Sequence, residues 1–174
     1  MPLQKLALVL GGASSGKSAF AEALVTGQGR PRVYVATAEA WDVEMQAKIA
    51  RHREARGPGW RTIEAPRDLV GALRDVRPAE TVLIDCATLW LSNLLLAQAD
   101  LAEEEERLLD ALRTCPAPIV VVSNEVGFGI VPDTPLGRRF RDAQGRLNQR
   151  LAASADMVVF VAAGLPLVLK GTLA

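Results

Sequence analysis

An eight-residue segment near the N-terminus has the residue types needed to hold a phosphate group. It runs from Gly11 to Ser18 as GGASSGKS and matches the pattern G-x-x-x-x-G-K-[ST]. Glycines let the backbone curl so that successive N–H groups face one anion, and a following helix adds its positive end. Lys17 should reach the β- and γ-phosphates, and the Ser18 hydroxyl should join the shell of a Mg²⁺ ion. The alternative interpretation is a Gly/Ser turn that only caps a helix. The predicted phosphate contacts are Gly11, Gly12, Ala13, Ser14, Ser15, Gly16, Lys17 and Ser18.

A carboxylate, Asp85, ends the apolar run Thr81-Val-Leu-Ile. In phosphate-binding sites an acid in this place orients the magnesium shell. The other interpretation is an ordinary acid at a strand end. Because a phosphate loop is present, we expect Ser18 and Asp85 to hold Mg²⁺ together.

The chain has one histidine, His52, and any imidazole chemistry must use it. On a helix, Lys48 and Arg56 would lie on the same face as His52. Neighbouring cations disfavour the imidazolium, so the ring should stay neutral near pH 7 and could attack a phosphorus atom. The other interpretation is a packing histidine or one group on a solvated basic face, and the spacing alone favours it.

A third segment, Asn124 to Pro132, follows another apolar run and contains Gly127 and Gly129. Ligands of open α/β sheets bind outside the carboxyl ends of the strands, so this segment is in the right place to line a site. The glycines could also only shape a turn. Five arginines follow, and their pattern is typical of a solvated helix face. They are Arg138, Arg139, Arg141, Arg146 and Arg150.

Apolar runs alternate with segments of helical periodicity along the whole chain. We expect strands over residues 6–10, 32–37, 81–85, 119–123 and 157–161, with a short last strand over 165–170. We expect helices over residues 17–26, 41–56, 67–76, 88–97, 101–113 and 136–151. Strands separated by helices predict an α/β fold whose mostly parallel central sheet has helices on both faces. With the phosphate loop, this is a P-loop NTPase-like arrangement.

Length and composition limit the remaining choices. The 174 residues fit a single domain, 1–174, and zero net charge argues against bulk binding of nucleic acid. Two cysteines in no metal-binding pattern favour a reducing, cytoplasmic location. Lys5 is followed by only five apolar residues, which is short for a signal peptide, and we expect no membrane span.

Taken together, these segments resemble one family, the bifunctional adenosylcobinamide kinase / adenosylcobinamide-phosphate guanylyltransferases of cobalamin biosynthesis. The phosphate loop is shared with unrelated nucleotide enzymes, whereas the segments around His52 and after Asn124 are much more specific. The matching stretches are GGASSGKS, VYVATAEA, DVEMQAKIARHREARGPGWRTIEAP, VLIDCATLWLSNLL, SNEVGFGIVPDTPLGRRFRDAQGRLNQRLAASAD and GLPLVLK.

The resemblance implies two reactions. The first transfers a phosphoryl group from ATP or GTP to the aminopropanol hydroxyl of adenosylcobinamide. In the second, a histidine attacks the α-phosphorus of GTP, carries GMP, and passes it to adenosylcobinamide phosphate to give adenosylcobinamide-GDP. The family's guanylylated histidine falls on His52, which favours the nucleophile over the packing histidine.

The resemblance also implies further nucleotide contacts and a homotrimer with the site close to a subunit boundary. Members often carry arginine at the position of Ser14 and a second histidine at that of Arg51. Beyond the phosphate loop, the implied nucleotide contacts are Ala36, Thr37, Ala38, Arg53, Glu54, Ala55, Arg56, Glu64 and Asp85.

Two other functions fit parts of the sequence. A P-loop kinase of another small molecule would leave His52 structural and form no covalent nucleotide. A GTP-binding switch would use a D-x-x-G motif, which Asp142 to Gly145 match. That match lies inside a predicted helix, and the chain has no N-K-x-D motif for guanine.

Overall fold

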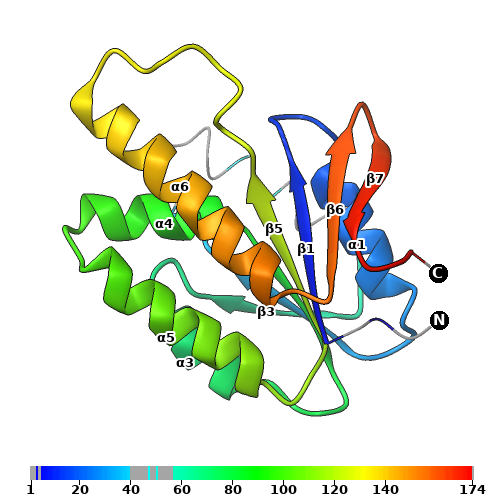
Figure 1. The fold of residues 1–174 in the computed structure, drawn as a ribbon. Helices are drawn as coiled ribbons and strands as arrows, with labels where there is room; N and C mark the ends of the chain where they lie inside the picture. The colour runs from blue at the N-terminus through cyan, green and yellow to red at the C-terminus, as the bar shows by residue number, and fades with distance from the viewer. Residues whose placement is uncertain (1–2, 4, 40–46, 48–49, 51–56, 174) are drawn as a thin grey trace.

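The computed structural model describes residues 3, 5–39, 47, 50 and 57–173. In this part of the chain one seven-stranded sheet has the order β3-β2-β4-β5-β1-β6-β7 (Figure 1). Neighbouring strands are parallel, except that β6 and β7 form an antiparallel hairpin. The strands are β1 (Leu6–Gly11), β2 (Arg32–Ala36), β3 (Trp60–Glu64), β4 (Thr81–Asp85), β5 (Ile119–Asn124), β6 (Met157–Ala162) and β7 (Leu165–Lys170).

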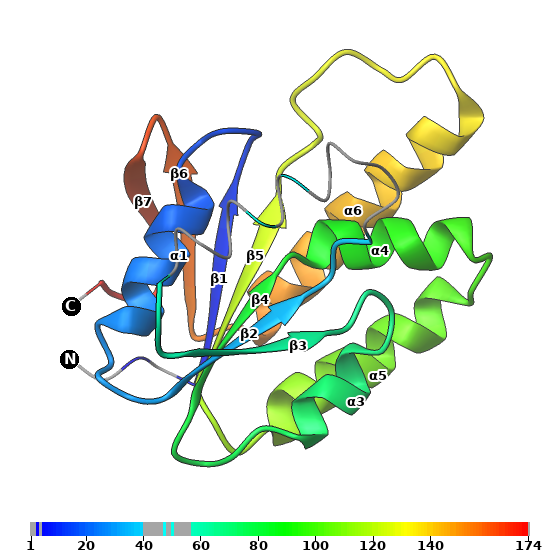
Figure 2. The same cartoon turned by 180° about the vertical axis from the view of Figure 1, so that it is seen from behind.

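The central strands are buried on both faces because helices cover both sides. Along β1, Leu8 and Leu10 pack in one core cluster, whereas Ala7 and Val9 pack in the other. Such continuous apolar runs are typical of parallel strands. Figures 1 and 2 show α1 on one face and the other described helices on the opposite face. The helices are α1 (Lys17–Thr26), α3 (Leu69–Arg74), α4 (Ala87–Leu96), α5 (Leu101–Thr114) and α6 (Pro135–Ser154).

The predicted mostly parallel α/β fold is therefore confirmed, and the two largest local differences concern β3 and α3. The strand β3 was not predicted: it lies at the sheet edge, only partly buried, and lacks a long apolar run. The helix predicted over 67–76 is the shorter α3, because the Asp68 side chain accepts a hydrogen bond from the Gly71 N–H and caps the helix there. The helix predicted over 41–56 lies outside the described residues, apart from Ala47 and Ala50, which are helical.

An ion pair fixes the edge strand β3 against the start of β4. Arg61 Nη2 lies 2.9 Å from Glu80 Oε2, whose side chain is 8% exposed. Burial by itself would raise the pKa of Glu80, but hydrogen bonds from Arg61 and the Arg77 backbone N–H, with both arginine charges, lower it below its usual value. Glu80 therefore stays ionised and holds the edge strand at neutral pH.

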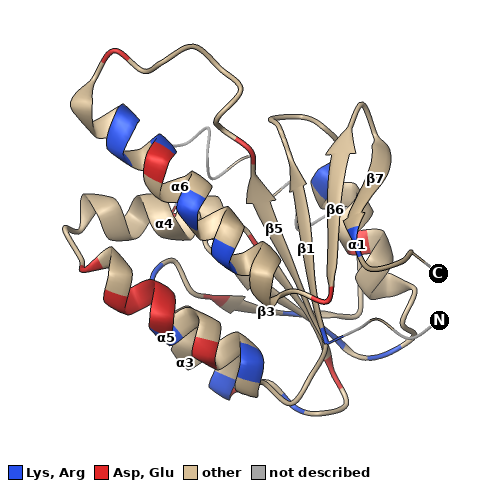
Figure 3. Ribbon diagram, viewed as in Figure 1, with Lys and Arg blue, Asp and Glu red and all other residues tan. Residues whose placement is uncertain are grey.

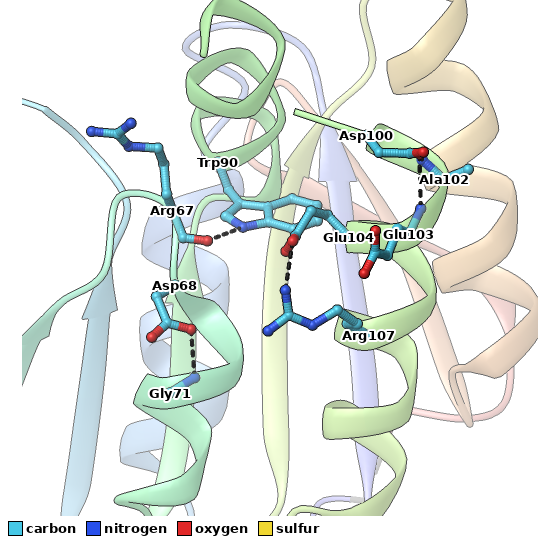
Figure 4. A network of polar contacts seen from close by, with 9 residues as sticks. All are labelled: Arg67, Asp68, Gly71, Trp90, Asp100, Ala102, Glu103, Glu104 and Arg107. Carbon is cyan, nitrogen blue, oxygen red and sulfur yellow. Dashed lines mark hydrogen bonds and ion pairs between the residues drawn. The ribbon is translucent and has the colours of Figure 1, made fainter. Parts of the chain in front are cut away.

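Polar groups also fix the ends of helices on the α4 side (Figure 4). Trp90 of α4 is buried, and its indole N–H donates to the Arg67 carbonyl at 2.9 Å. The Asp100 carboxylate accepts from the N–H groups of Ala102 and Glu103 and caps α5. Trp90 is thus a core residue that joins α4 to the segment before α3.

The arginines of α6 are not all solvated, so that expectation is partly wrong. Figure 3 shows basic residues on α6 beside acidic residues on α5. Arg150 of α6 pairs with Glu105 at 2.9 Å and also with Glu106. Arg138 and Arg141 donate to backbone carbonyls of the segment before α6. These arginines therefore fix the position of that segment and of α5.

Among the described helices, none combines the length and the apolar character needed to cross a lipid bilayer. Both cysteines, Cys86 and Cys115, are buried free thiols.

Candidate functional site

The predicted phosphate loop connects the end of β1 to the start of α1. Ser14 and Gly16 have φ angles of 55° and 92°, so the backbone turns through the left-handed region twice. Gly16 is the N-cap of α1, and no side-chain hydrogen bond caps that end of the helix. The first N–H groups of α1 are thus available to an anion.

Glycine is required at the first position of the loop because of close contacts. A Cβ on Gly11 would lie 2.4 Å from Ser15 Oγ and 2.6 Å from the Val161 carbonyl oxygen. The Lys17 ammonium donates to the Gly12 carbonyl at 3.1 Å, so the lysine folds back across the loop. A phosphate bound in the loop can replace that carbonyl as its partner.

Asp85 is the last residue of β4 and faces the α1 side of the sheet. The Tyr34 hydroxyl donates to its Oδ2 at 3.0 Å. Among the described residues Oδ1 has no hydrogen bond, which leaves it available to a cation. Tyr34 was not predicted as part of the site. Its position between Val33 and Val35 in β2 indicates only that it faces the opposite side of the sheet from those two valines.

Thr37 locks the segments that follow β2 and β4 to each other. Its hydroxyl donates to the Cys86 carbonyl at 2.8 Å and accepts from the Cys86 N–H at 2.7 Å. Its carbonyl accepts from the Asn93 amide at 2.9 Å. Thr37 is fully buried, so its side chain positions Asp85 and does not face solvent.

The charges of Lys17 and Asp85 both affect the pKa of the buried Cys86 thiol. Burial raises the pKa of Cys86, and the neighbouring Asp85 carboxylate raises it further, whereas backbone hydrogen bonds and the Lys17 charge lower it. The net shift is upward, so the thiol stays protonated.

The segment after β5 is tied to the phosphate loop and to two helices. Asn124 is in register with Gly11, and the Glu125 N–H donates to the Gly11 carbonyl at 3.1 Å. On the opposite side, Asn148 of α6 donates to the Asn124 carbonyl at 3.0 Å and accepts from the Ser123 hydroxyl at 2.7 Å. A buried polar network thus fixes the strand end next to the loop.

A second support of the loop was not predicted. The N–H of Gly164, in the turn between β6 and β7, donates to the Ser15 carbonyl at 2.8 Å. The sequence signal was the Ala-Gly pair between two apolar runs, which indicated a turn but not what it touches.

The other predicted contacts lie along the same edge of the sheet. Ala36 is in register with both Asp85 and Glu64, and Ala38 follows it. Glu64 is exposed on β3, four strands from β1, or about 19 Å at the usual strand spacing. Glu64 therefore lies away from the phosphate loop. The predicted residues His52, Arg53, Glu54, Ala55 and Arg56 lie outside the described residues.

Comparison with known proteins tests the resemblance. A family model described as "Cobinamide kinase / cobinamide phosphate guanyltransferase" matches residues 7–169. The bifunctional adenosylcobalamin biosynthesis protein CobP of Pseudomonas aeruginosa is 47% identical over 167 residues, which cover 94% of this chain and 96% of that one. The protein CobU of Salmonella typhimurium, with the same description, is 43% identical over 179 residues, or 94% of this chain and 98% of that one. The family resemblance is confirmed.

Solved structures show a similar fold at low identity. The flagellar accessory protein FlaH of Methanocaldococcus jannaschii has a TM-score of 0.56 and 14% identity, over 99% of this chain and 80% of that chain. A solved ATPase domain has a TM-score of 0.52 and 14% identity, over 90% of this chain and 68% of that chain. These matches support the predicted P-loop NTPase-like fold.

Proposed function

The chain belongs to the cobinamide kinase / cobinamide phosphate guanyltransferase family and is a bifunctional enzyme of cobalamin biosynthesis; we propose that both of its reactions use the site at the carboxyl edge of the sheet. The observation that carries the proposal is the phosphate loop of Gly11 to Ser18, with Lys17 folded back across it and Asp85 at the end of β4, two strands from β1. It lies within the stretch that the family model matches.

In the kinase reaction the loop holds the triphosphate of ATP or GTP. The Lys17 ammonium moves from the Gly12 carbonyl to the β- and γ-phosphates. The aminopropanol hydroxyl of adenosylcobinamide attacks the γ-phosphorus, a new P–O bond forms, and the bond to the β-phosphate oxygen breaks. The chain contributes mainly positioning and charge neutralisation.

A hard divalent cation fits the available donors. The Ser18 hydroxyl and Oδ1 of Asp85 are oxygen ligands, which Mg²⁺ prefers. The described residues contain no group of three acidic, histidine or cysteine side chains able to hold a metal, so the other ligands would be phosphate and water. When bound, Mg²⁺ neutralises charge on the phosphates and on the leaving group.

In the guanylyl transfer we assign the nucleophile to His52, the one histidine of the chain. A neutral ring nitrogen forms a P–N bond to the α-phosphorus of GTP, the bond to the bridging oxygen breaks, and pyrophosphate leaves. Arg53 and Arg56 stabilise the developing charge. The phosphate of adenosylcobinamide phosphate then attacks the same phosphorus, and the P–N bond breaks to give adenosylcobinamide-GDP.

Apart from Thr37, which is fully buried, the remaining contacts belong to the nucleoside. Ala36, Thr37 and Ala38 lie between the phosphate loop and Glu64 along the edge. The span of about 19 Å from β1 to β3 suits an extended nucleotide. We therefore propose that Glu64 meets the guanosine end, together with Glu54 and Ala55 from the segment after His52.

An exposed apolar sheet face supports a homotrimer. Leu165, Leu167 and Leu169 of β7 are 72%, 60% and 57% exposed. Leu167 is in register with Phe160, so both share the sheet face on which α6 lies. Figure 1 shows that α6 leaves β7 uncovered. Exposed apolar surface of this kind marks an interface.

Free thiols support the proposed cytoplasmic location. Cys86 and Cys115 are both buried, and neither forms a disulfide. An oxidising compartment would favour a disulfide-based framework instead.

The experiment that tests the function uses GTP labelled at the α-phosphate. Wild-type protein should retain label after denaturation, and acid should release it, because the P–N bond is acid-labile. His52→Asn should retain none while keeping kinase activity. Lys17→Ala is the control that should lose both reactions. Absence of label on an active wild-type kinase would leave a P-loop small-molecule kinase with a structural His52.

A further inference from the structure

The turn between β6 and β7 lies against the phosphate loop, although the chain reaches it only near the C-terminus. The Gly164 N–H donates to the Ser15 carbonyl at 2.8 Å. This bond reaches the middle of the loop, whereas the bond from Glu125 reaches its first residue, Gly11.

The backbone of the turn also packs against Gly16, where the loop becomes α1. A Cβ on Gly16 would lie 3.0 Å from Gly164 Cα and 3.5 Å from its nitrogen. The φ angles of Gly16 and Gly164 are 92° and 77°. Two left-handed glycines thus meet backbone to backbone, and a side chain at Gly16 would crowd this approach.

The Gly164 hydrogen bond has a directional effect on the loop. The peptide between Ser15 and Gly16 is trans. In a planar trans peptide the carbonyl and the N–H point in opposite directions. Holding the Ser15 carbonyl toward the turn therefore directs the Gly16 N–H away from the turn.

We propose that the β6–β7 turn is a positioning element of the nucleotide site, in which Gly164 orients the Gly16 N–H toward the phosphates. The proposal rests on the proposed function, because it assigns a role at the same site. It adds a C-terminal residue, Gly164, to the machinery that fixes nucleotide affinity. Gly164 acts through Ser15 and Gly16 and does not itself touch the substrate.

The test compares two left-handed glycines, of which Gly164 donates to the phosphate loop and Gly29 donates to the Thr26 carbonyl of α1. Gly164 and Gly29 have φ angles of 77° and 63°, and an added Cβ at either meets nothing within 4 Å. Alanine is therefore equally strained at both positions and clashes at neither. Gly29 follows the end of α1 and serves as the matched control.

We expect Gly164→Ala to raise the Kd for a non-hydrolysable GTP analogue about tenfold, and Gly29→Ala to change it less than about twofold. Both variants should lower Tm by similar amounts. Equal Kd changes in the two variants would overturn the proposal. Failure of wild type and Lys17→Ala to differ in binding would instead contradict the proposed function.

Hydrogen exchange of the wild-type protein gives a second readout that needs no variant. The analogue should slow exchange of the Gly164 amide, because an occupied loop holds the Ser15 carbonyl in place, and should leave the Gly29 amide unchanged. Unchanged exchange at Gly164 with the analogue bound would also overturn the proposal.

Discussion

At the residue scale, one of the two oxygens of the Asp85 carboxylate, at the end of β4, is held by a hydrogen bond from the described residues. The Tyr34 hydroxyl donates to Oδ2 of Asp85, and the Thr37 hydroxyl binds both the N–H and the carbonyl of the next residue, Cys86. These contacts hold the carboxyl group in one orientation without using Oδ1. A group held this way is suited to bind a cation without reorganising, which is the role that we propose for it.

This orientation predicts graded effects of two variants. Asp85→Asn should lower the kinase kcat about 100-fold, because the amide carries no charge to hold the metal. Tyr34→Phe keeps the charge of Asp85 and removes the hydrogen bond to its Oδ2, so a loss of about threefold to tenfold is expected. The measurement is kinase turnover against Mg²⁺ concentration, in which Asp85→Asn should also need more Mg²⁺ for half-saturation.

Identical Mg²⁺ curves for wild type and Asp85→Asn would exclude the metal role. Tyr34→Phe checks that the effect follows the charge of the carboxyl group and not the packing around it.

The sequence predicted the residues that touch phosphate better than those that orient them. Lys17, Ser18 and Asp85 follow from a motif and a strand end, which are local patterns. Tyr34, Asn148 and Gly164 act through tertiary contacts with residues far away in sequence, and no local pattern encodes such a partner. Thr37 was predicted as a contact, yet its hydroxyl serves the backbone of Cys86.

At the element scale, β5 and α6 are joined by amide and hydroxyl groups at the end nearest the loop. Asn148 takes part in three hydrogen bonds, to Ser123, Gln144 and the Asn124 carbonyl. Gln144 donates to Ser123 and Asn148, but its own buried Oε1 has no hydrogen-bond partner among the described residues. The two amides therefore contribute unequally to the same network.

This difference predicts unequal losses of stability. Asn148→Leu leaves the Asn124 carbonyl and the Ser123 hydroxyl without this partner and should cost about 2–4 kcal/mol. Gln144→Leu keeps the bond between Ser123 and Asn148 and removes an unsatisfied oxygen, so about 1 kcal/mol or less is expected. Urea unfolding measures both, with exposed Gln149→Leu on the same helix as the control. Equal losses at Asn148 and Gln144 would contradict this account of the network.

Elements with strong apolar periodicity were predicted nearly to their ends, whereas an edge element was not. The helix α1 has the predicted bounds, and α5 differs by one residue at its end. The strand β3 escaped prediction because an edge strand needs few buried side chains, and Trp60 and Ile63 are only partly covered. Its position depends on pairing with β2 and on Glu80, which are not local to it.

At the scale of the whole molecule, the sheet order joins the proposed nucleotide site to the proposed subunit interface. The turn that supports Ser15 continues directly into β7, the strand with the exposed leucines. A partner subunit that covers β7 would restrict the motion of that turn. Because linkage is reciprocal, nucleotide binding would then strengthen assembly by the same factor.

A charge on the apolar face of β7 tests this connection. Leu167→Glu should convert a trimer to monomers, because burying an unpaired carboxylate is strongly unfavourable. Leu96→Glu is the matched control, since Leu96 of α4 is also 60% exposed but lies away from β7. Light scattering across a range of protein concentrations gives the mass of each. A wild-type monomer, or an unaltered mass for Leu167→Glu, would contradict the proposed interface.

The same pair of variants tests whether assembly restricts the motion of the turn. If it does, monomeric Leu167→Glu should bind the GTP analogue more weakly than Leu96→Glu. Equal affinities would show that the loop positions its phosphate contacts without a partner subunit.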